Sequence, residues 1–482
     1  MAIMTSPTSA NIPLDVLKEV MMHGIIYGMM VSDDQEARVL LRMNASAVCR
    51  QWKALVDNTS IFWSLVWVPL DPPPPDESLR KALARSGTQP LDIIVQTGSC
   101  AENEEFVLAY EVMKSLLSPH MQRWKRVQLD LHDWENVGAV VSTWEGAAVL
   151  LEELSLSSES ADDLHETSLC LHPKFTAPRL RTFTLHDISY MAGGKTLHMH
   201  FPSLGKLSLV RSCFDEAIGI GNWPKLMQIL KSLTYLHSLS LTPDCGGYDD
   251  EDEEDEEDEE DEDEDEDTDR DVVRGSGSRP SLESLEHLAI RDMSPPGINK
   301  LLAAFTAPRL THIEIANIQS TPSLNDEDDY LEETKALLTH FPALHTLTFE
   351  EHDGLGPRCL DIDELQNLAE GFEHLNLVRD DLGPLLESLT KQVAAQSQWP
   401  FPRSAVIQFE GEVPVAALRE LVEACAVAGH AIESVVIVQS ASECPGDDSS
   451  WFKSKLQKFS WTTMSNPDGI VDKGSLAFLV HG

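Results

Sequence analysis

The stretch FTAPRLRTFTLHDIS at residues 175–189 returns as FTAPRLTHIEIANIQ at residues 305–319. Both copies begin with the same six residues and then alternate apolar and polar side chains, as a half-buried strand does. A second pair, HFPSLGKLSL at 200–209 and HFPALHTLTF at 340–349, follows the same design. Internal repeats of this kind predict an array in which each unit buries its apolar face against its neighbours.

The repeats share one spacing, L-x-x-L-x-L, and most copies follow one another after 24 to 34 residues. The first position of each copy is Trp124, Leu151, Leu180, Leu204, Leu236, Leu285, Leu310, Leu344, Phe372, Pro402 (a degenerate copy) and Ile432. Stretches with helical periodicity, such as 224–233, 298–305 and 418–429, lie between the copies. A strand and a helix in each unit predict an α/β fold with a parallel sheet and helices on its outer side.

This spacing resembles that of irregular leucine-rich repeats, which form α/β solenoids. The ninth position departs from the family pattern, because the usual Asn or Cys is replaced by Glu159, Ile188, Ser212, Met293, Ile318 and His352. The first, fourth and sixth residues of each copy should point into the core, and the third, fifth and seventh should form the concave face.

The concave face is where such an array would hold a protein substrate. Its expected polar contacts are His186, His287, Arg291, His312, Glu314 and His374. The same residues also fit a solvated surface without a partner, in which His287 and His312 are neighbours that titrate at the ordinary histidine value of about 6.5. Loops at either rim of the sheet are a third place for a partner.

Three short apolar-periodic stretches in residues 11–58 predict helices. The second extends from about Gln35 to Met43. The third should begin with Ser46 as its cap and present on one face Val48, Trp52, Leu55 and Val56. A strand should follow, with Leu65 and Trp67 on one side. Three short helices bury too little apolar surface to stand alone, so they need a neighbour or a partner.

The order IPLDVL, LLRM, VCRQWKALV and IFWSLVWV, between residues 12 and 68, resembles the F-box. The segment ARSGTQPLDI at 84–93 is similar to the region that follows the F-box in mushroom-type fungal proteins. Two features depart from the pattern, namely Ile12 in place of Leu and a long first loop at 24–37.

The resemblance implies that the helices bind the Skp-type adaptor of a cullin-RING ubiquitin ligase. The adaptor-binding residues that it implies are Ile12, Pro13, Leu14, Leu17, Leu41, Val48, Cys49 and Trp52. Trp63 and Trp67 are expected to anchor this module to the repeats.

The predicted organisation is an N-terminal three-helix F-box followed by an irregular leucine-rich-repeat-like α/β solenoid. Its parts are a disordered N-terminus at 1–10, the F-box at 11–70, the solenoid at 71–440 with a disordered acidic insertion at 246–280, and a C-terminal cap or tail at 441–482. In the last part Phe452, Leu456 and Phe459 have helical spacing, which fits a cap over the open end of the array.

The acidic insertion contains an unbroken run of acidic residues, Asp249 to Asp267. It carries 19 of the formal net charge of −44, and the rest of the chain is acidic as well. One interpretation is a docking tail for a basic protein, and the other is a solvated surface loop that tolerates expansion.

Other classes of function find little support in the residues. Clustered Lys and Arg, which a nucleic-acid or anionic-membrane partner needs, are nearly absent. His198 and His200 form an H-x-H pair without a third metal ligand in view, and the eight scattered cysteines form no CxxC pair. No cofactor, metal or catalytic motif is therefore expected. The chain has no apolar run of about 18 residues and no leader-like N-terminus, which predicts a cytoplasmic or nuclear protein.

These observations predict a non-catalytic substrate-recognition subunit of an SCF-type ubiquitin ligase. Its partners would be the Skp-type adaptor and cullin, together with an unknown protein substrate. The alternative is a repeat scaffold outside any ligase, whose acidic run binds or chaperones a basic protein and whose N-terminal helices only cap the array. Partial exposure of Leu14, Leu17 and Val48 on a face away from the repeats would favour the first interpretation, and their burial against the first repeat would favour the second.

Overall fold

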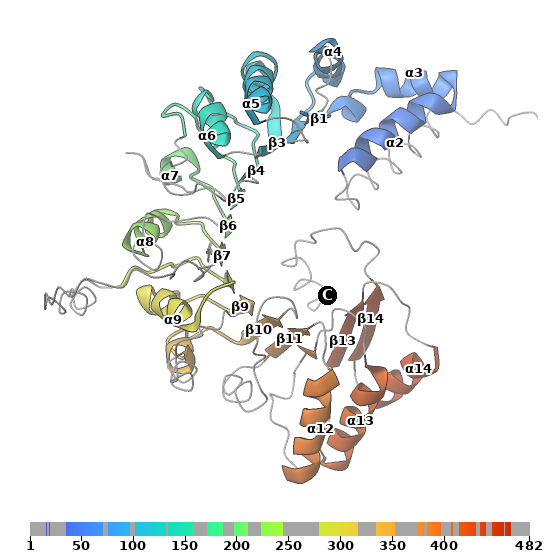
Figure 1. Cartoon of the computed structure of the whole chain (residues 1–482), viewed down its shortest axis with the longest axis vertical. Helices are drawn as coiled ribbons and strands as arrows, with labels where there is room; N and C mark the ends of the chain where they lie inside the picture. Colours follow the sequence, from blue (N-terminus) through green and yellow to red (C-terminus); the bar gives the residue numbers. More distant parts are fainter. Residues whose placement is uncertain are drawn as a thin grey trace, which may run out of the picture.

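The computed structural model shows an α/β protein built on one twelve-stranded parallel sheet. The residues that it describes are 16, 19, 35–70, 76–96, 102–131, 134–158, 171–186, 197–210, 223–243, 279–316, 334–351, 374–379, 383–396, 406–407, 414–429, 434–439, 446–456 and 458–463. The strands lie side by side in the order of the sequence, and they trace an open arc (Figure 1).

The sheet uses the strands of ten of the eleven copies that the repeat spacing predicts, all but the copy at Ile432, and two more strands before them. Its strands are β1 Leu65–Pro69, β2 Leu91–Gln96, β3 Trp124–Leu131, β4 Glu153–Ser158, β5 Thr182–His186, β6 Lys206–Val210, β7 Ser238–Thr242, β8 His287–Arg291, β9 His312–Ala316, β10 Thr346–Glu351, β11 His374–Arg379 and β12 Val406–Ile407. Parallel pairing throughout confirms the predicted parallel sheet. The sheet begins inside the segment 11–70, because β1 pairs with β2.

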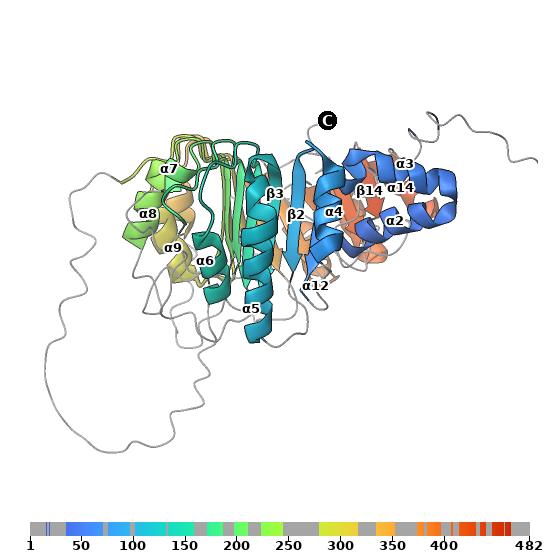
Figure 2. The ribbon, with the colours of Figure 1, turned by 90° about the horizontal axis from the view of Figure 1, so that it is seen from above.

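Helices cover the outer side of the arc, as Figure 2 shows from above. They are α4 Asp76–Ser86, α5 Glu102–Glu111, the π-helix η2 Val112–Leu117, the 3-10 helix η3 Ser118–Arg123, α6 Trp134–Ser142, α7 Leu197–His200, α8 Trp223–Ser232, α9 Pro295–Ala304, α12 Gly383–Gln396, α13 Val415–Val427 and α14 Gly446–Lys455. The periodic stretches at 224–233, 298–305 and 418–429 coincide with α8, α9 and α13, which confirms these predictions.

Alternation along β4 to β9 separates a buried face of the sheet from a half-buried one. In β6, Leu207 and Leu209 are buried while the residues between them are half-buried, and β8 follows the same pattern. Equivalent apolar residues stand in register, as in the pairing of Leu207 with Leu239 and of Leu239 with Leu288. The core is therefore a continuous layer between the sheet and its helices.

Buried aromatic rings reinforce this layer near the amino-terminal ends of the strands. The ring centroids of Trp124 and Trp144 are 5.2 Å apart, and those of Trp144 and Phe175 are 5.5 Å apart. Phe201 continues the row, 6.2 Å from Phe175 and 5.2 Å from Phe183. Edge-on and tilted contacts of this kind add to the stabilisation that burial alone provides.

The C-terminal region departs from the predicted array. Residues after Ile432 form β13, Ser434–Gln439, which pairs with β14, Lys458–Thr463, in a separate two-stranded sheet. Phe452 and Leu456 are buried in the main core, as a cap requires. Phe459 lies in β14, so the predicted helical continuation to Phe459 is wrong. The acidic insertion and the N-terminal residues 1–10 lie outside the described residues.

Candidate functional site

Two helices, α2 (Gln35–Val48) and α3 (Arg50–Asn58), precede the sheet and form a helical pair. The prediction that the second of them begins at Ser46 is wrong. Ser46 lies in the last turns of α2, where its hydroxyl donates a hydrogen bond of 2.9 Å to the carbonyl oxygen of Arg42. The break between the helices falls at Cys49, whose extended backbone (φ −161°) makes it the N-cap of α3.

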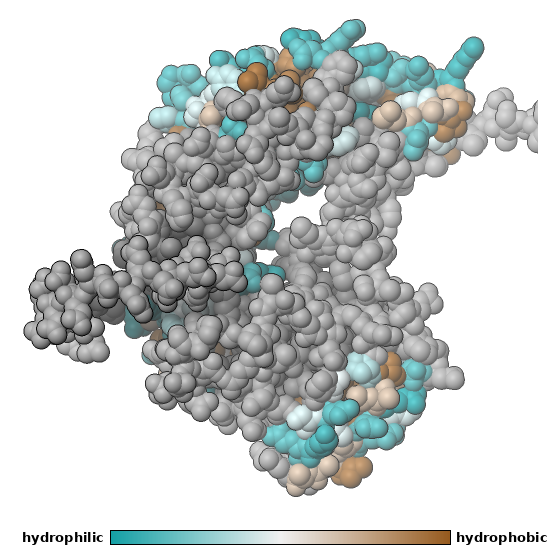
Figure 3. Space-filling view, in the orientation of Figure 1, coloured by the Kyte–Doolittle hydropathy of each residue, from teal (hydrophilic) through white to brown (hydrophobic). Residues whose placement is uncertain are grey.

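Val48 and Trp52 consequently lie on different helices and face different surroundings. Val48 is 60% exposed and Met43 is 58% exposed, and Cys49 is exposed at the turn between the helices. The hydropathy surface shows apolar area at this end of the pair (Figure 3). Trp52 packs against the small core of the pair, which consists of Ala45, Leu55, Val56 and Phe62. We call the exposed Met43, Val48 and Cys49 the junction surface.

The structure describes only part of the predicted adaptor-binding set, whose role in binding stays a prediction. Val48 and Cys49 belong to the junction surface, and Trp52 lies in the first turn of α3. Leu41 lies in α2, but its side chain is outside the described residues. Ile12, Pro13, Leu14 and Leu17 also lie outside the described residues. Met43, which the sequence reasoning missed, is found only from its exposure in the fold.

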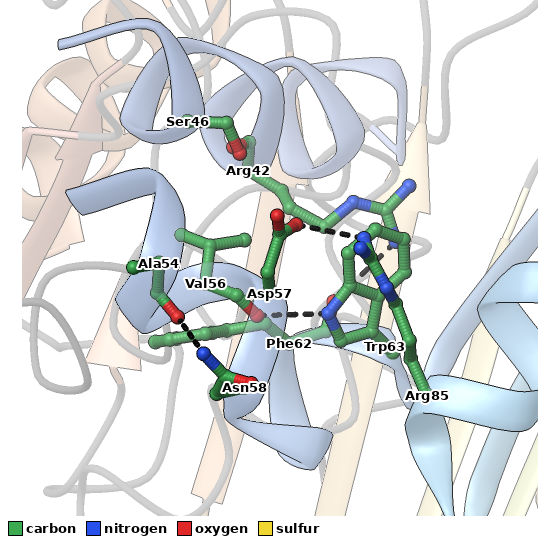
Figure 4. A network of polar contacts seen from close by, with 9 residues as sticks. All are labelled: Arg42, Ser46, Ala54, Val56, Asp57, Asn58, Phe62, Trp63 and Arg85. Atoms are coloured by element: carbon green, nitrogen blue, oxygen red, sulfur yellow. Dashed lines mark hydrogen bonds and ion pairs between the residues drawn. The ribbon is translucent and has the colours of Figure 1, made fainter. Parts of the chain in front are cut away.

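The helical pair meets the sheet at Trp63, which ends the 3-10 helix η1 (Ser60–Trp63). The guanidinium of Arg42 lies 4.6 Å from the centre of the Trp63 ring, and that of Arg85 lies 4.5 Å from it (Figure 4). The indole Nε1 of Trp63 donates a 2.8 Å hydrogen bond to the carbonyl oxygen of Val56. Arg85 also pairs with Asp57 at 2.7 Å. Burial and the charge of Arg85 both lower the pKa of Arg42.

Trp67 lies within the sheet instead of at this contact. It is half-buried in β1, and its Nε1 lies 3.4 Å from Oε1 of Gln96 in the neighbouring strand. Leu65 and Trp67 share one side of β1, as predicted for a strand, and the residues that face the main core are Val66 and Val68 on its other side. Leu65 is buried as well, because η1 and the helical pair lie beside it.

The inner side of the arc, opposite the described helices, corresponds to the predicted concave face, and we call it the helix-free face (Figure 1). It brings two of the predicted substrate-contacting histidines together. His287 on β8 stands directly opposite His312 on β9. Their ring centroids are 5.7 Å apart, with the rings edge to face. Nε2 of His312 forms a 2.8 Å hydrogen bond with the hydroxyl of Thr348 on β10. Thr348 was not predicted to take part, since a lone threonine in a strand carries no signal of its own.

These histidines do not titrate like solvated ones. Desolvation, followed by the nearby charges of His287 and His345, lowers the pKa of His312 from 6.5 to about 4. Desolvation also lowers the pKa of His287, and His237 acts in the same direction, while Glu286 opposes the shift. The expectation of titration near 6.5 is therefore wrong, because both rings are partly withdrawn from water.

The remaining predicted residues of this face lie at different distances from the pair. Arg291 at the end of β8 forms an ion pair with Glu314 on β9. His374 is in register with Thr346, and thus continues the row of His287 and His312, but its side chain is outside the described residues. His186 is half-buried on β5, with β6 and β7 between it and β8, so the structure does not bring it to the others.

The two histidines of the H-x-H pair lie in different surroundings. His200 is buried, and its Nδ1 lies 2.7 Å from the carbonyl oxygen of Phe175, whereas His198 is exposed on α7. Across the described residues, no group of three or more His, Cys, Asp or Glu side chains could hold a metal ion. Burial raises the pKa of the Cys425 thiol to about 12, so this cysteine is a poor nucleophile.

Two surfaces thus stand out in the described part of the chain, the junction surface on the helical pair and the histidine-containing face of β8 to β10. Within that same part, no helix has both the length and the apolar character needed to cross a membrane. No protein-family model matches this chain, and no curated protein sequence matches it.

Proposed function

We propose that this protein is the substrate-recognition subunit of an SCF-type cullin-RING ubiquitin ligase. In this proposal the N-terminal helices are an F-box that binds the Skp-type adaptor, and the repeats are an irregular leucine-rich-repeat-like solenoid that binds a protein substrate. The chain itself performs no chemistry. It raises the effective concentration of the substrate near the ligase.

The observation that carries the proposal is the exposure of Val48 at the junction surface. The helical pair could have used this side chain to pack against the first strands, which is what an end cap would do. Instead Val48 and Met43 present apolar area to solvent, and the small core of the pair has only four buried apolar residues among those described. An exposed apolar surface on a small helical unit is typical of a binding site for another protein.

The helix-free face supports the second half of the proposal. It carries half-buried polar side chains that neighbouring strands hold in place, which suits recognition of a protein surface. A partner on this face would meet two imidazole rings, those of His287 and His312, beside the ion pair of Arg291 and Glu314. With their pKa values lowered, the two histidines are neutral at pH 7 and offer hydrogen-bonding groups instead of charges.

The test is a pair of matched aspartate variants in the full chain. Met43→Asp with Val48→Asp should abolish co-purification of the adaptor and cullin, because each substitution places an unpaired charge in an apolar interface at a cost of several kcal/mol. Val427→Asp is the control, since Val427 is 91% exposed on α13, far along the chain from the helical pair. Full adaptor binding by the double variant, or none by the wild type, would refute the proposal.

The alternative is a scaffold whose acidic run binds a basic protein. It predicts a different outcome, namely that partners are lost on deletion of Asp249 to Asp267 and are kept in the junction double variant. Because exposed charges are screened by salt, such partners should be captured only at low ionic strength. The exposure of Val48 favours the ligase subunit over this alternative.

A further inference from the structure

Among the described residues, the helical pair and the sheet have separate clusters of buried apolar side chains. Ala45, Leu55, Val56 and Phe62 form the first, and the continuous core of the sheet, which includes Val66, Val68, Leu79 and Leu83, forms the second. A shared core would fix the orientation of two units by packing over a large area. With separate cores, the orientation depends on the smaller contacts between them, and the best defined of these lies around Trp63.

Trp63 is held from three directions, which together define how the units sit. Arg42 approaches the indole ring from α2, and Arg85 approaches it from α4, whose own side chains Leu79 and Leu83 belong to the sheet core (Figure 4). The hydrogen bond from Nε1 to the carbonyl oxygen of Val56 fixes the ring relative to α3. Cations over an indole face are attracted by its ring electrons, and the attraction grows as water is excluded.

The ion pair between Arg85 and Asp57 further restricts how the helical pair can be oriented relative to α4. Their side chains are 26% and 27% exposed, so the pair is more shielded than an ordinary surface ion pair. Asp57 belongs to α3 and Arg85 to α4, so this bond crosses directly from the helical pair to the sheet. Arg85 can stack on the ring and reach the carboxylate at the same time because the guanidinium is planar and has donors along its edge.

We infer that Trp63, Arg42, Arg85 and Asp57 form a joint that holds the helical pair in one orientation relative to the sheet. The consequence for activity rests on the proposed function: the joint positions a bound adaptor, and with it the ligase, relative to a substrate on the helix-free face. Trp63 and Arg85 are then positioning residues that touch neither partner. Loss of the joint should loosen the geometry while the two binding surfaces stay intact.

The test measures orientation directly in the full chain. Spin labels are attached to p-acetylphenylalanine placed at Lys53 on α3 and Lys81 on α4, both exposed, so that the native cysteines are untouched. The wild type should give one narrow distance distribution by pulsed electron resonance. Trp63→Ala and Arg85→Gln should both lose the narrow peak and give a broad distribution, while circular dichroism remains native.

Trp52→Ala is the matched control, because it removes an aromatic ring that packs against the same small core, whereas the two arginines stack on Trp63. It should keep the narrow peak. If it broadens the distribution as much as Trp63→Ala does, the effect belongs to the small core and the inference is wrong. Should Trp63→Ala fail to fold, Arg85→Gln decides alone, and an unchanged narrow peak in that variant overturns the joint.

Adaptor affinity is measured separately on the wild type and Arg85→Gln. The inference expects equal affinities, because Arg85 lies on α4 and not at the junction surface. A wild type that does not bind the adaptor would refute the proposed function, yet the distance distributions would still decide whether the joint exists. A weaker adaptor affinity in Arg85→Gln would show that Arg85 does more than position, against the inference.

Discussion

The imidazole rings of His287 and His312 lie edge to face on adjacent strands, with their centroids 5.7 Å apart. Partial burial opposes the charge of both rings, and a charge on His287 would further disfavour one on His312. The pair is therefore neutral at pH 7. Its protonation should cost stability in acid.

Stability between pH 4 and 6.5 should depend on His312. The unfolded chain binds a proton at a pKa near 6.5, whereas the folded protein binds it only near 4. Below pH 6.5 the unfolded state consequently holds more protons, and the free energy of unfolding falls as the pH drops from 6.5 to 4, by at most about 3 kcal/mol from this residue. Urea titrations of the wild type and His312→Gln at several pH values should show a weaker fall in the variant.

The control for this experiment is His198→Gln. His198 is exposed on α7, so its replacement should leave the fall in stability unchanged. A His312→Gln variant whose stability follows the wild type across the whole pH range would show that the burial of His312 has no thermodynamic weight.

Substrate capture should weaken when His287, Arg291 and His312 are replaced together by Ala, because these residues give the helix-free face its polar character. Adaptor binding should persist. The proteins that co-purify with the wild type and with the triple variant are identified by mass spectrometry and compared. The control is His198→Ala on the outer helix α7, without a change at His200, since His200 is buried and bonded to the backbone of Phe175. Targets lost from the His198 variant but kept by the triple variant would place the binding surface on the helical side of the sheet.

Phe201→Ala should destabilise the protein by about 3 to 5 kcal/mol, because it leaves a cavity in the aromatic row. The ring of Phe201 is fully buried and lies 5.2 Å from that of Phe183. Tyr235→Ala, at a residue that is 66% exposed, should change stability by no more than about 0.5 kcal/mol. Chemical unfolding of both variants checks the contrast, and equal effects would contradict the assignment of the core.

Two glycines should respond to alanine in opposite directions. Gly87 follows the last residue of α4 with φ +57°, so Gly87→Ala forces a side chain into the left-handed region and should cost about 1 kcal/mol. Gly138 lies inside α6, and no atom lies within 4 Å of the place that an alanine methyl group would take there. Gly138→Ala should therefore stabilise the helix by about 0.5 to 1 kcal/mol. Melting temperatures of the two variants and the wild type check this contrast. A shift of both melting temperatures in the same direction would contradict the prediction.

The strands could be predicted because a single spacing recurs along the chain. Leu207 with Leu209 and Leu288 with Ile290 occupy the same two positions of the pattern, and each pair is buried as the alternation requires. The strands β1 and β2 lie outside this pattern, so the repeat alone did not mark the start of the sheet.

Contacts between distant residues could not be predicted in the same way. Ser46 is a good capping residue in isolation, but its hydroxyl bonds to the preceding turn and the helix continues to Val48. The stacking of Arg42 and Arg85 on Trp63 joins three separate elements, and no local pattern announces it. The lowered pKa of His312 likewise follows from burial among neighbouring strands, which a sequence does not display.

The pairing of each strand with its immediate neighbours in sequence has a consequence for how the protein can change over generations. Ser238 pairs with His287 in the same manner as Lys206 pairs with Ser238, although the connection from β7 to β8 is longer and includes the acidic run. The register between neighbouring strands thus does not depend on the length of the segment that connects them. Insertions in these connecting segments can therefore be inherited and lengthened while the strands of the sheet keep their register.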